Sequence, residues 1–171
     1  MDLKGEILKE NSKAQALRIT AYIGNDEDKF AKLIQLFLSD DYRVTQRAAW
    51  ILSHCCDEHP ELIKPHLTRI VKNLDNNPNI AVKRNTVRIL QFIQLPESLM
   101  GPLADHCFNY LRSPKETIAV KVFSMTILSN ICRYFPELSN ELIPIIEEQM
   151  PYGSAGFKSR GKKVLKELSR N

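Results

Sequence analysis

A near match to a nucleotide-binding loop lies close to the C-terminal end of the sequence. Residues 156–163 read GFKSRGKK, which approaches the phosphate-binding pattern Gly-x-x-x-x-Gly-Lys-Ser/Thr. Lys163 stands where that pattern needs a hydroxyl for magnesium, and no strand precedes the segment. Residues 157–168 also fit a helix, which would leave no loop to surround a phosphate. We therefore expect no nucleotide hydrolysis and no cofactor.

A second group of reactive side chains lies at residues 54–59, where two histidines flank two adjacent cysteines. A zinc site needs three or four converging ligands, and Cys55 belongs to an apolar helix face, so we expect no metal site. Nothing marks the orienting acid or the oxyanion donors that a Cys–His nucleophile would need. We interpret all the cysteines as reduced, buried thiols of a cytoplasmic protein: Cys55, Cys56, Cys107 and Cys132.

Basic side chains form the third chemical group, and they are concentrated at the C-terminal end. The whole chain has a formal charge of +4. Residues 155–171 carry six basic side chains and one acid, which leaves residues 1–154 with a net charge of −1. The overall charge therefore describes the last helix rather than the whole protein. Such a local patch can attract nucleic acid or an acidic partner.

These side chains are positioned by helices that repeat about every 38 residues. Leu52, Leu90, Leu128 and Leu165 each end an Ile-Leu or Val-Leu pair, at spacings of 38, 38 and 37 residues. Apolar residues at offsets −8, −1, 0 and +3 from each leucine form one face of an α-helix. The −4 offset on the same face takes small residues that let neighbouring helices approach closely: Ala48, Thr86, Ser124 and Gly161.

Further amphipathic patterns and turn residues complete a series of helix pairs. Pro-Glu steps stand where helices begin, clusters of Asp, Asn, Ser and Pro mark connections, and no run shows strand alternation. With 43% hydrophobic and 26% charged residues, no run as long as a membrane span and no signal-peptide core, we expect a soluble globular chain. We predict a single all-α domain over residues 1–171, with an N-terminal helix at about 3–23 and helix pairs at about 26–57, 60–94, 97–134 and 138–169.

The segment DDYRVTQRAAWIL, residues 40–52, resembles the HEAT repeat and its armadillo relatives. An acidic turn leads into a second helix with Val, Arg, Ala and Leu at HEAT-like spacing, and residues 79–90 repeat the pattern more loosely. The resemblance implies an α-α superhelix, a right-handed solenoid of about four HEAT-like helix pairs plus the N-terminal helix. The slot of Arg47 holds Asn85 and Phe123 in the next two units, so we expect no Asp–Arg ladder beyond the first unit.

In a solenoid of this type the second helices line the concave side. Offsets −6, −2 and +1 lie opposite the apolar face, and the row Trp50, Arg88, Thr126, Lys163 would extend roughly 30 Å. An aromatic ring beside arginines suits carboxylates, phosphates or a peptide backbone. Alternatively, Trp50 packs between helices and the basic residues form a solvated face. The candidate binding residues are Trp50, Arg84, Arg88, Lys121, Arg160 and Lys163.

Our leading hypothesis is a non-enzymatic cytoplasmic scaffold that binds a protein or peptide through the concave second-helix face and the basic C-terminal end. The alternative is a nucleic-acid-binding protein with a groove like that of HEAT-like DNA-repair glycosylases, using the central and C-terminal basic residues. An enzyme is a third class, for which we identify no catalytic constellation. The basic C-terminal helix also suits the polar outer face that the last repeat of a solenoid needs.

Overall fold

The computed structural model describes residues 1–170, and all regular secondary structure in this range is helical. The predicted all-α helical-repeat fold is therefore confirmed. Contacts divide the chain into two compact units, Met1–Ile89 and Leu90–Asn171. The predicted single domain over the whole chain stays a prediction. No helix in residues 1–170 combines the length and the apolar content that crossing a bilayer requires.

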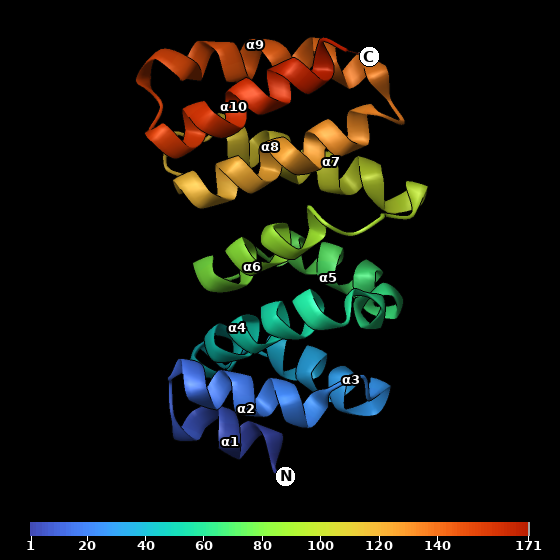
Figure 1. Cartoon of the computed structure of the whole chain (residues 1–171), viewed down its shortest axis with the longest axis vertical. Helices are drawn as coiled ribbons and strands as arrows, with labels where there is room; N and C mark the ends of the chain where they lie inside the picture. The colour runs from blue at the N-terminus through green and yellow to red at the C-terminus, as the bar shows by residue number, and fades with distance from the viewer. Residues whose placement is uncertain (171) are drawn as a thin grey trace. The chain divides into compact units, whose positions relative to one another are not determined.

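The first unit consists of helices stacked in successive layers (Figure 1). The long helix α4 packs against α3, α2 and α1, and its core side chains Val44, Ala48 and Leu52 are fully buried. Two 3-10 segments, Pro60–His66 and Leu74–Asn76, flank α5. The α-helices are α1 (Leu3–Lys9), α2 (Lys13–Ile23), α3 (Glu27–Phe37), α4 (Tyr42–Glu58), α5 (Leu67–Asn73) and α6 (Ile80–Leu90), whose last residue begins the second unit.

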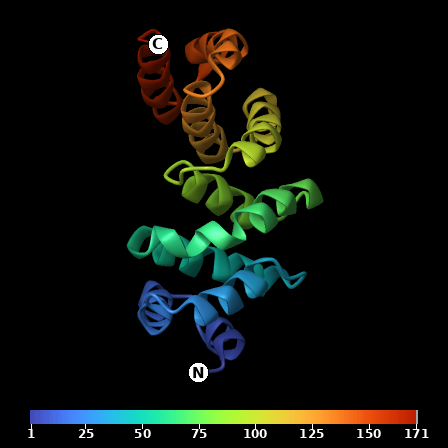
Figure 2. The same ribbon diagram turned by 90° about the vertical axis from the view of Figure 1, so that its right-hand side faces the viewer.

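The second unit contains two helix pairs, α7 with α8 and α9 with α10 (Figures 1 and 2). Helix α8 packs against both α7 and α10. The approach of α10 is close, because a Cβ atom at Gly161 would lie 2.7 Å from Met150 Sδ and 3.1 Å from Ile146 Cγ2. The small residue at this slot therefore has the packing role expected of it. The helices are α7 (Glu97–Arg112), α8 (Ile118–Cys132), α9 (Ser139–Gln149) and α10 (Ala155–Leu168), with 3-10 turns at Pro136–Leu138 and Met150–Tyr152.

The second helix of every pair begins at an N-cap residue eleven positions before its repeat leucine. In each case the side-chain oxygen accepts a hydrogen bond from a backbone N–H of the first turn, which would otherwise lack a partner. This local chemistry explains why the helix starts recur with the same period as the core residues. The four caps are Asp41, Asn79, Thr117 and Ser154.

The predicted N-terminal helix at about 3–23 is wrong, because the structure has two helices there. Helix α1 ends at Lys9, and Glu10 is extended with φ −148° and ψ 143°. Ser12 then starts α2 by accepting the Gln15 N–H at 3.1 Å. Arg47 Nη1 donates to the carbonyls of Ile7 and Leu8 near the end of α1, at 3.1 and 2.8 Å. The break is stable because a cap and a guanidinium satisfy backbone groups that a continuous helix would pair internally.

The predicted apolar face is buried in all four second helices, apart from Ile93 and Leu165, which are half-buried. Ile93 differs because α6 ends at Leu90, so residues 91–95 are not helical. Leu95 precedes Pro96, which disfavours a helical backbone at Leu95. The carbonyl of Gln91 instead accepts a hydrogen bond from Asn130 Nδ2 of α8 at 3.0 Å. The second helix of this repeat is therefore shorter than the sequence predicts.

Candidate binding face and pocket

The exposed side of the second helices is narrower than the sequence predicts. Residues at offsets −6 and −2, among them Trp50 and Arg84, are exposed or half-exposed, but those at +1 are buried in the first three repeats. Ser53 Oγ, at +1, donates to Asn85 Oδ1 of α6 at 2.6 Å, and Ser129 Oγ donates to Glu167 Oε2 of α10 at 3.2 Å. The +1 side chains lie at the contact with the next second helix, so they connect helices and are not exposed to solvent. We use "second-helix face" for the −6 and −2 positions in each unit.

In the first unit this face carries an aromatic ring and the arginine of an ion pair. The side chain of Trp50 is 37% exposed, and its ring centroid lies 6.0 Å from that of His54. Arg88 Nη2 donates to Asp57 Oδ2 at 3.0 Å. Arg84 is exposed. The structure thus brings three predicted residues onto α4 and α6, but a carboxylate already neutralises one of the two arginines.

In the second unit Arg160 connects α10 to neighbouring elements instead of facing solvent. Its Nη1 donates to Gln91 Oε1 at 3.1 Å and also to Thr126 Oγ1. Arg160 occupies the slot of Arg47 and Asn85, and all three make hydrogen bonds to the preceding repeat or helix. The partners of these three residues are backbone carbonyls, a serine hydroxyl, a glutamine amide and a threonine hydroxyl. In the first, second and fourth units this slot therefore holds a polar residue that bonds to another helix, whereas the third unit has Phe123 there.

Lys121 lies away from the second-helix face, in a pocket formed at the turns of the second unit. Its Nζ donates to Gln149 Oε1 at 2.9 Å. Desolvation lowers the pKa of Lys121, against an opposing effect of the Glu116 carboxylate. The pocket also contains the exposed ring of Tyr152. The structure therefore does not bring Lys121 together with Lys163, which is exposed on α10.

Three basic side chains of the second unit are exposed, Arg133, Lys163 and Lys166, and we call these residues the basic patch. Asp57 and Arg88, which pair in the first unit, occupy the repeat positions that Arg133 and Lys163 occupy here. The repeat therefore places two positive charges where the first unit has an ion pair. Within the described residues, no carboxylate pairs with any of the three side chains, and Glu167, the one acid of α10, accepts from Ser129.

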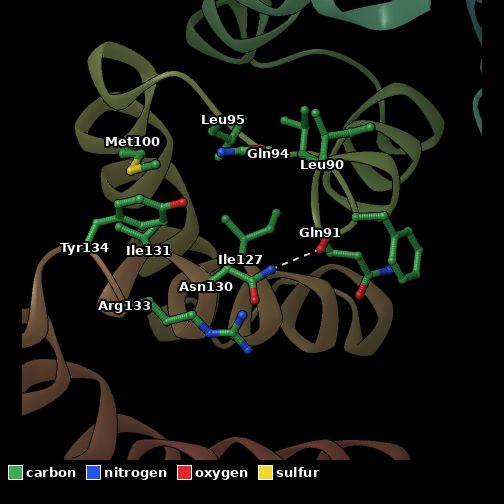
Figure 3. A pocket seen from close by; sticks show the side chains of 12 residues that line it. Leu90, Gln91, Gln94, Leu95, Met100, Ile127, Asn130, Ile131, Arg133 and Tyr134 are labelled. Atoms are coloured by element: carbon green, nitrogen blue, oxygen red, sulfur yellow. Dashed lines mark hydrogen bonds between the residues drawn. The ribbon is translucent and has the colours of Figure 1, made fainter. Parts of the chain in front are cut away.

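A pocket of about 270 Å³ within the second unit includes Arg133 of the basic patch in its lining. Figure 3 shows Leu90, at the end of α6, and Leu95, in the α6–α7 connection, opposite Ile127 and Ile131 of α8. Polar groups lie at its margin, because Asn130 donates to the Gln91 carbonyl there and the Gln91 amide oxygen accepts from Arg160 of α10. The other lining residues include Met100, Arg133, Tyr134, Gln94 and Phe92.

Sequence reasoning missed the pocket and the two exposed aromatic rings that line it. Phe92 is 72% exposed and Tyr134 is 55% exposed. One signal was present, because Phe92 stands at an offset of +2 where the other repeats have the polar residues His54, Asn130 and Glu167. An apolar residue at a position that is otherwise polar indicates a local departure from the repeat. The pocket exists because α6 ends early, at Leu90. In the sequence, only Pro96 indicates that this helix ends early.

The cysteines and the residues that approach a phosphate-binding loop all lie within helices. Burial raises the pKa of the Cys55 thiol to about 12, and burial likewise raises that of Cys56, so both are protonated at neutral pH. All four cysteines are buried thiols. No cluster of three His, Cys, Asp or Glu residues in the described part of the chain could hold a metal. Residues 156–163 lie inside α10, so they form a helix and not a phosphate-binding loop.

Comparison with protein families gives one match, which covers nearly the whole chain. A family model described as a HEAT repeat domain matches residues 3–168. Neither the curated proteins nor the solved structures contain a significant match.

Proposed function

The chain belongs to the HEAT repeat family, and from this premise we propose that it is a non-enzymatic scaffold that binds an acidic segment of another protein. The contact surface is the second-helix face together with the basic C-terminal end. HEAT repeats present stacked helices as an extended surface, and proteins of this kind act through what that surface binds. The four thiols without a disulfide suit a reducing compartment, so we place the protein in the cytoplasm.

The observation that carries this proposal is the unbalanced charge of the basic patch. In the first unit Asp57 already supplies a carboxylate to Arg88. Arg133, Lys163 and Lys166 have no such partner among the described residues. Lys163 and Lys166 are three residues apart on α10 and so share one helix face, on which a row of carboxylates can lie. A partner segment rich in aspartate or glutamate supplies the negative charges that these three side chains lack. Electrostatic attraction also makes its association faster and dependent on salt concentration.

The same contacts weigh against a nucleic-acid groove along the second helices. Such a groove needs many basic side chains that are free to contact phosphates. Arg88 is paired with Asp57, and Arg160 is held by Gln91 and Thr126. Lys121 donates to Gln149 in a separate pocket. Three of the five basic candidates are thus engaged within the protein, so we retain nucleic acid only as an outcome of the test.

The test measures fluorescence anisotropy of a labelled nine-residue peptide, eight glutamates around a central alanine, with labelled duplex DNA beside it. Both are titrated with the full chain over a salt series. The variant Lys163→Glu/Lys166→Glu removes the patch, and Lys32→Glu/Lys72→Glu, on exposed positions of α3 and α5, makes the same change in net charge elsewhere. We expect the patch variant to weaken peptide binding about tenfold or more and the control to change it less than about twofold.

Two results would overturn the proposal. Equal losses in both variants would mean that net charge alone attracts the peptide, and the patch would have no specific role. Tighter binding of DNA than of the peptide, with a steep salt dependence that the patch variant removes, would establish the nucleic-acid alternative instead.

A further inference from the structure

We propose that the pocket between the α6–α7 connection and α8 takes one large apolar side chain of the acidic partner segment. This inference deepens the proposed function and rests on it. It adds a point of specificity to the basic patch, which by itself distinguishes only charge. The partner is thus defined as an acidic segment that contains an aromatic or large aliphatic residue.

The size and lining of the pocket favour a single side chain over a whole small molecule. Its volume of about 270 Å³ lies below the range of roughly 300–1,000 Å³ typical of small-molecule sites. Leu95, Met100, Ile127 and Ile131 line it together with polar groups of Gln91, Gln94 and Asn130. The favourable part of binding is therefore the transfer of the incoming side chain's own apolar surface out of water.

The pocket is held open by hydrogen bonds that exist without any ligand. Asn130 Nδ2 of α8 fixes the Gln91 carbonyl at 3.0 Å, and Arg160 of α10 fixes the Gln91 amide oxygen at 3.1 Å. The backbone that forms one wall is therefore anchored to α8, and the Gln91 side chain is anchored to α10. Because the wall is already ordered, a ligand does not have to bear the entropic cost of ordering it.

The rim of the pocket has the residue types that dominate protein interfaces. The exposed rings of Phe92 and Tyr134 can close over an inserted side chain, and aromatic residues of this kind are enriched among the strongest interface contacts. Arg133 belongs both to the pocket lining and to the basic patch. A segment whose apolar residue fills the pocket therefore places its neighbouring carboxylates beside Arg133 and the lysines of α10. This charge complementarity selects an acidic protein segment as the occupant.

The experiment compares two labelled peptides of equal charge, titrated by anisotropy with the full chain. One is eight glutamates around a central tryptophan, and the other has alanine at the centre. We expect the tryptophan peptide to bind at least tenfold more tightly. The variant Phe92→Ala/Tyr134→Ala should remove this difference and leave the affinity for the alanine peptide and the melting temperature unchanged, because both rings are exposed. Tyr152→Ala, at an exposed ring of the same unit outside the pocket, should preserve the difference.

Each other outcome overturns a defined part of the argument. Equal affinity for both peptides overturns the pocket proposal while the acidic-segment proposal stands. A lost difference in Tyr152→Ala as well as in the rim variant also overturns it, because the pocket would then have no special role. If neither peptide binds, the proposed function falls and the pocket proposal falls with it. If sedimentation shows a dimer that the rim variant converts to a monomer, the occupant is a second copy of this chain and not a partner.

Discussion

Replacing Arg160 by methionine tests whether this arginine stabilises the fold, in contrast to the exposed basic residues on the same helix. Arg160 is half-buried, and its guanidinium donates to Gln91 Oε1 and to Thr126 Oγ1. Methionine keeps much of the unbranched apolar stem, so the packing of that stem changes little while both hydrogen bonds are lost. The buried Gln91 then has an amide oxygen without its donor. We therefore expect Arg160→Met to destabilise the second unit.

The expected loss follows from these two bonds. A hydrogen bond from a charged donor contributes about 1.5–3 kcal/mol, and Arg160 is partly exposed, so we take about 2 kcal/mol for the pair. A change of 1 kcal/mol shifts the melting temperature by roughly 4–8 °C in a domain of 60–100 residues and by roughly 2–4 °C in one of 150–250 residues. The loss is therefore about 8–16 °C if the second unit unfolds alone. It is about 4–8 °C if the whole chain unfolds as one.

The assay is thermal and urea unfolding followed by circular dichroism, with Lys163→Met as the matched control. Lys163 is exposed, and removing it deletes the same charge three residues further along α10. We expect its effect on stability to be below about 0.5 kcal/mol. Arg160→Lys should fall between wild type and Arg160→Met, because an ammonium group lacks the planar fork of a guanidinium. Equal losses in Arg160→Met and Lys163→Met, or none in either, would refute the assignment of Arg160 to packing.

Three further outcomes follow from other contacts. Gly156→Ala should stabilise the protein by about 0.5–1 kcal/mol in urea unfolding, because its Cβ would meet only Ser154 Oγ, at 4.0 Å, on helix α10. Gly161→Ala should destabilise it by about 1 kcal/mol, because its Cβ enters the α9–α10 contact. Similar gains in both variants would contradict that close approach. Burial raises the pKa of Cys55 from about 9 to about 12, so the folded protein keeps this thiol protonated. The urea midpoint should therefore be constant below pH 9 and fall as the pH rises toward 12. Rapid labelling of native thiols by a disulfide reagent at pH 8 would argue against a buried, protonated Cys55. Asp57→Asn removes the carboxylate partner of Arg88. This variant should bind the alanine-centred glutamate peptide severalfold more tightly, because Arg88 is then free to pair with it. An unchanged affinity would mean that the ion pair does not limit peptide binding at the first unit.

The contrast between the two units suggests how a repeat scaffold differentiates its surface. The core positions and helix caps are nearly the same in every repeat, because they determine whether a helix pair forms and packs. Asp57 is exposed and Arg88 is half-buried, so a basic residue can replace the exposed acid without loss of the fold. One repeat then has a neutral surface and another a basic one on the same framework. In our proposal this difference directs the acidic partner to the second unit.

Most of the fold could be predicted from the sequence, because the features that determine it are local and periodic. A helix buries one face, so apolar residues recur at helical spacing, and the caps recur with them. Val44, Val120 and Leu128 are buried as their register predicts. The N-terminal helix and the early end of α6 were exceptions among the elements. Ser12 is a strong N-cap residue, but the sequence contains no sign that Arg47 would satisfy the carbonyls at the end of α1.

The binding site could be predicted only in part, because it depends on which side chains meet across repeats. Spacing identified Trp50, Arg84 and Lys163 as exposed, but it gave Arg160 the same status as Lys163. Contacts between residues far apart in the sequence determine which arginines are engaged. Arg47 bonds to Ile7, 40 positions away, and Arg160 bonds to Gln91, 69 positions away. The sequence by itself determined where helices form and which face is buried, since both follow from a few neighbouring residues. Only the tertiary structure decided which charges are paired and where α6 leaves a pocket, because those depend on atoms that folding brings within about 3 Å of one another.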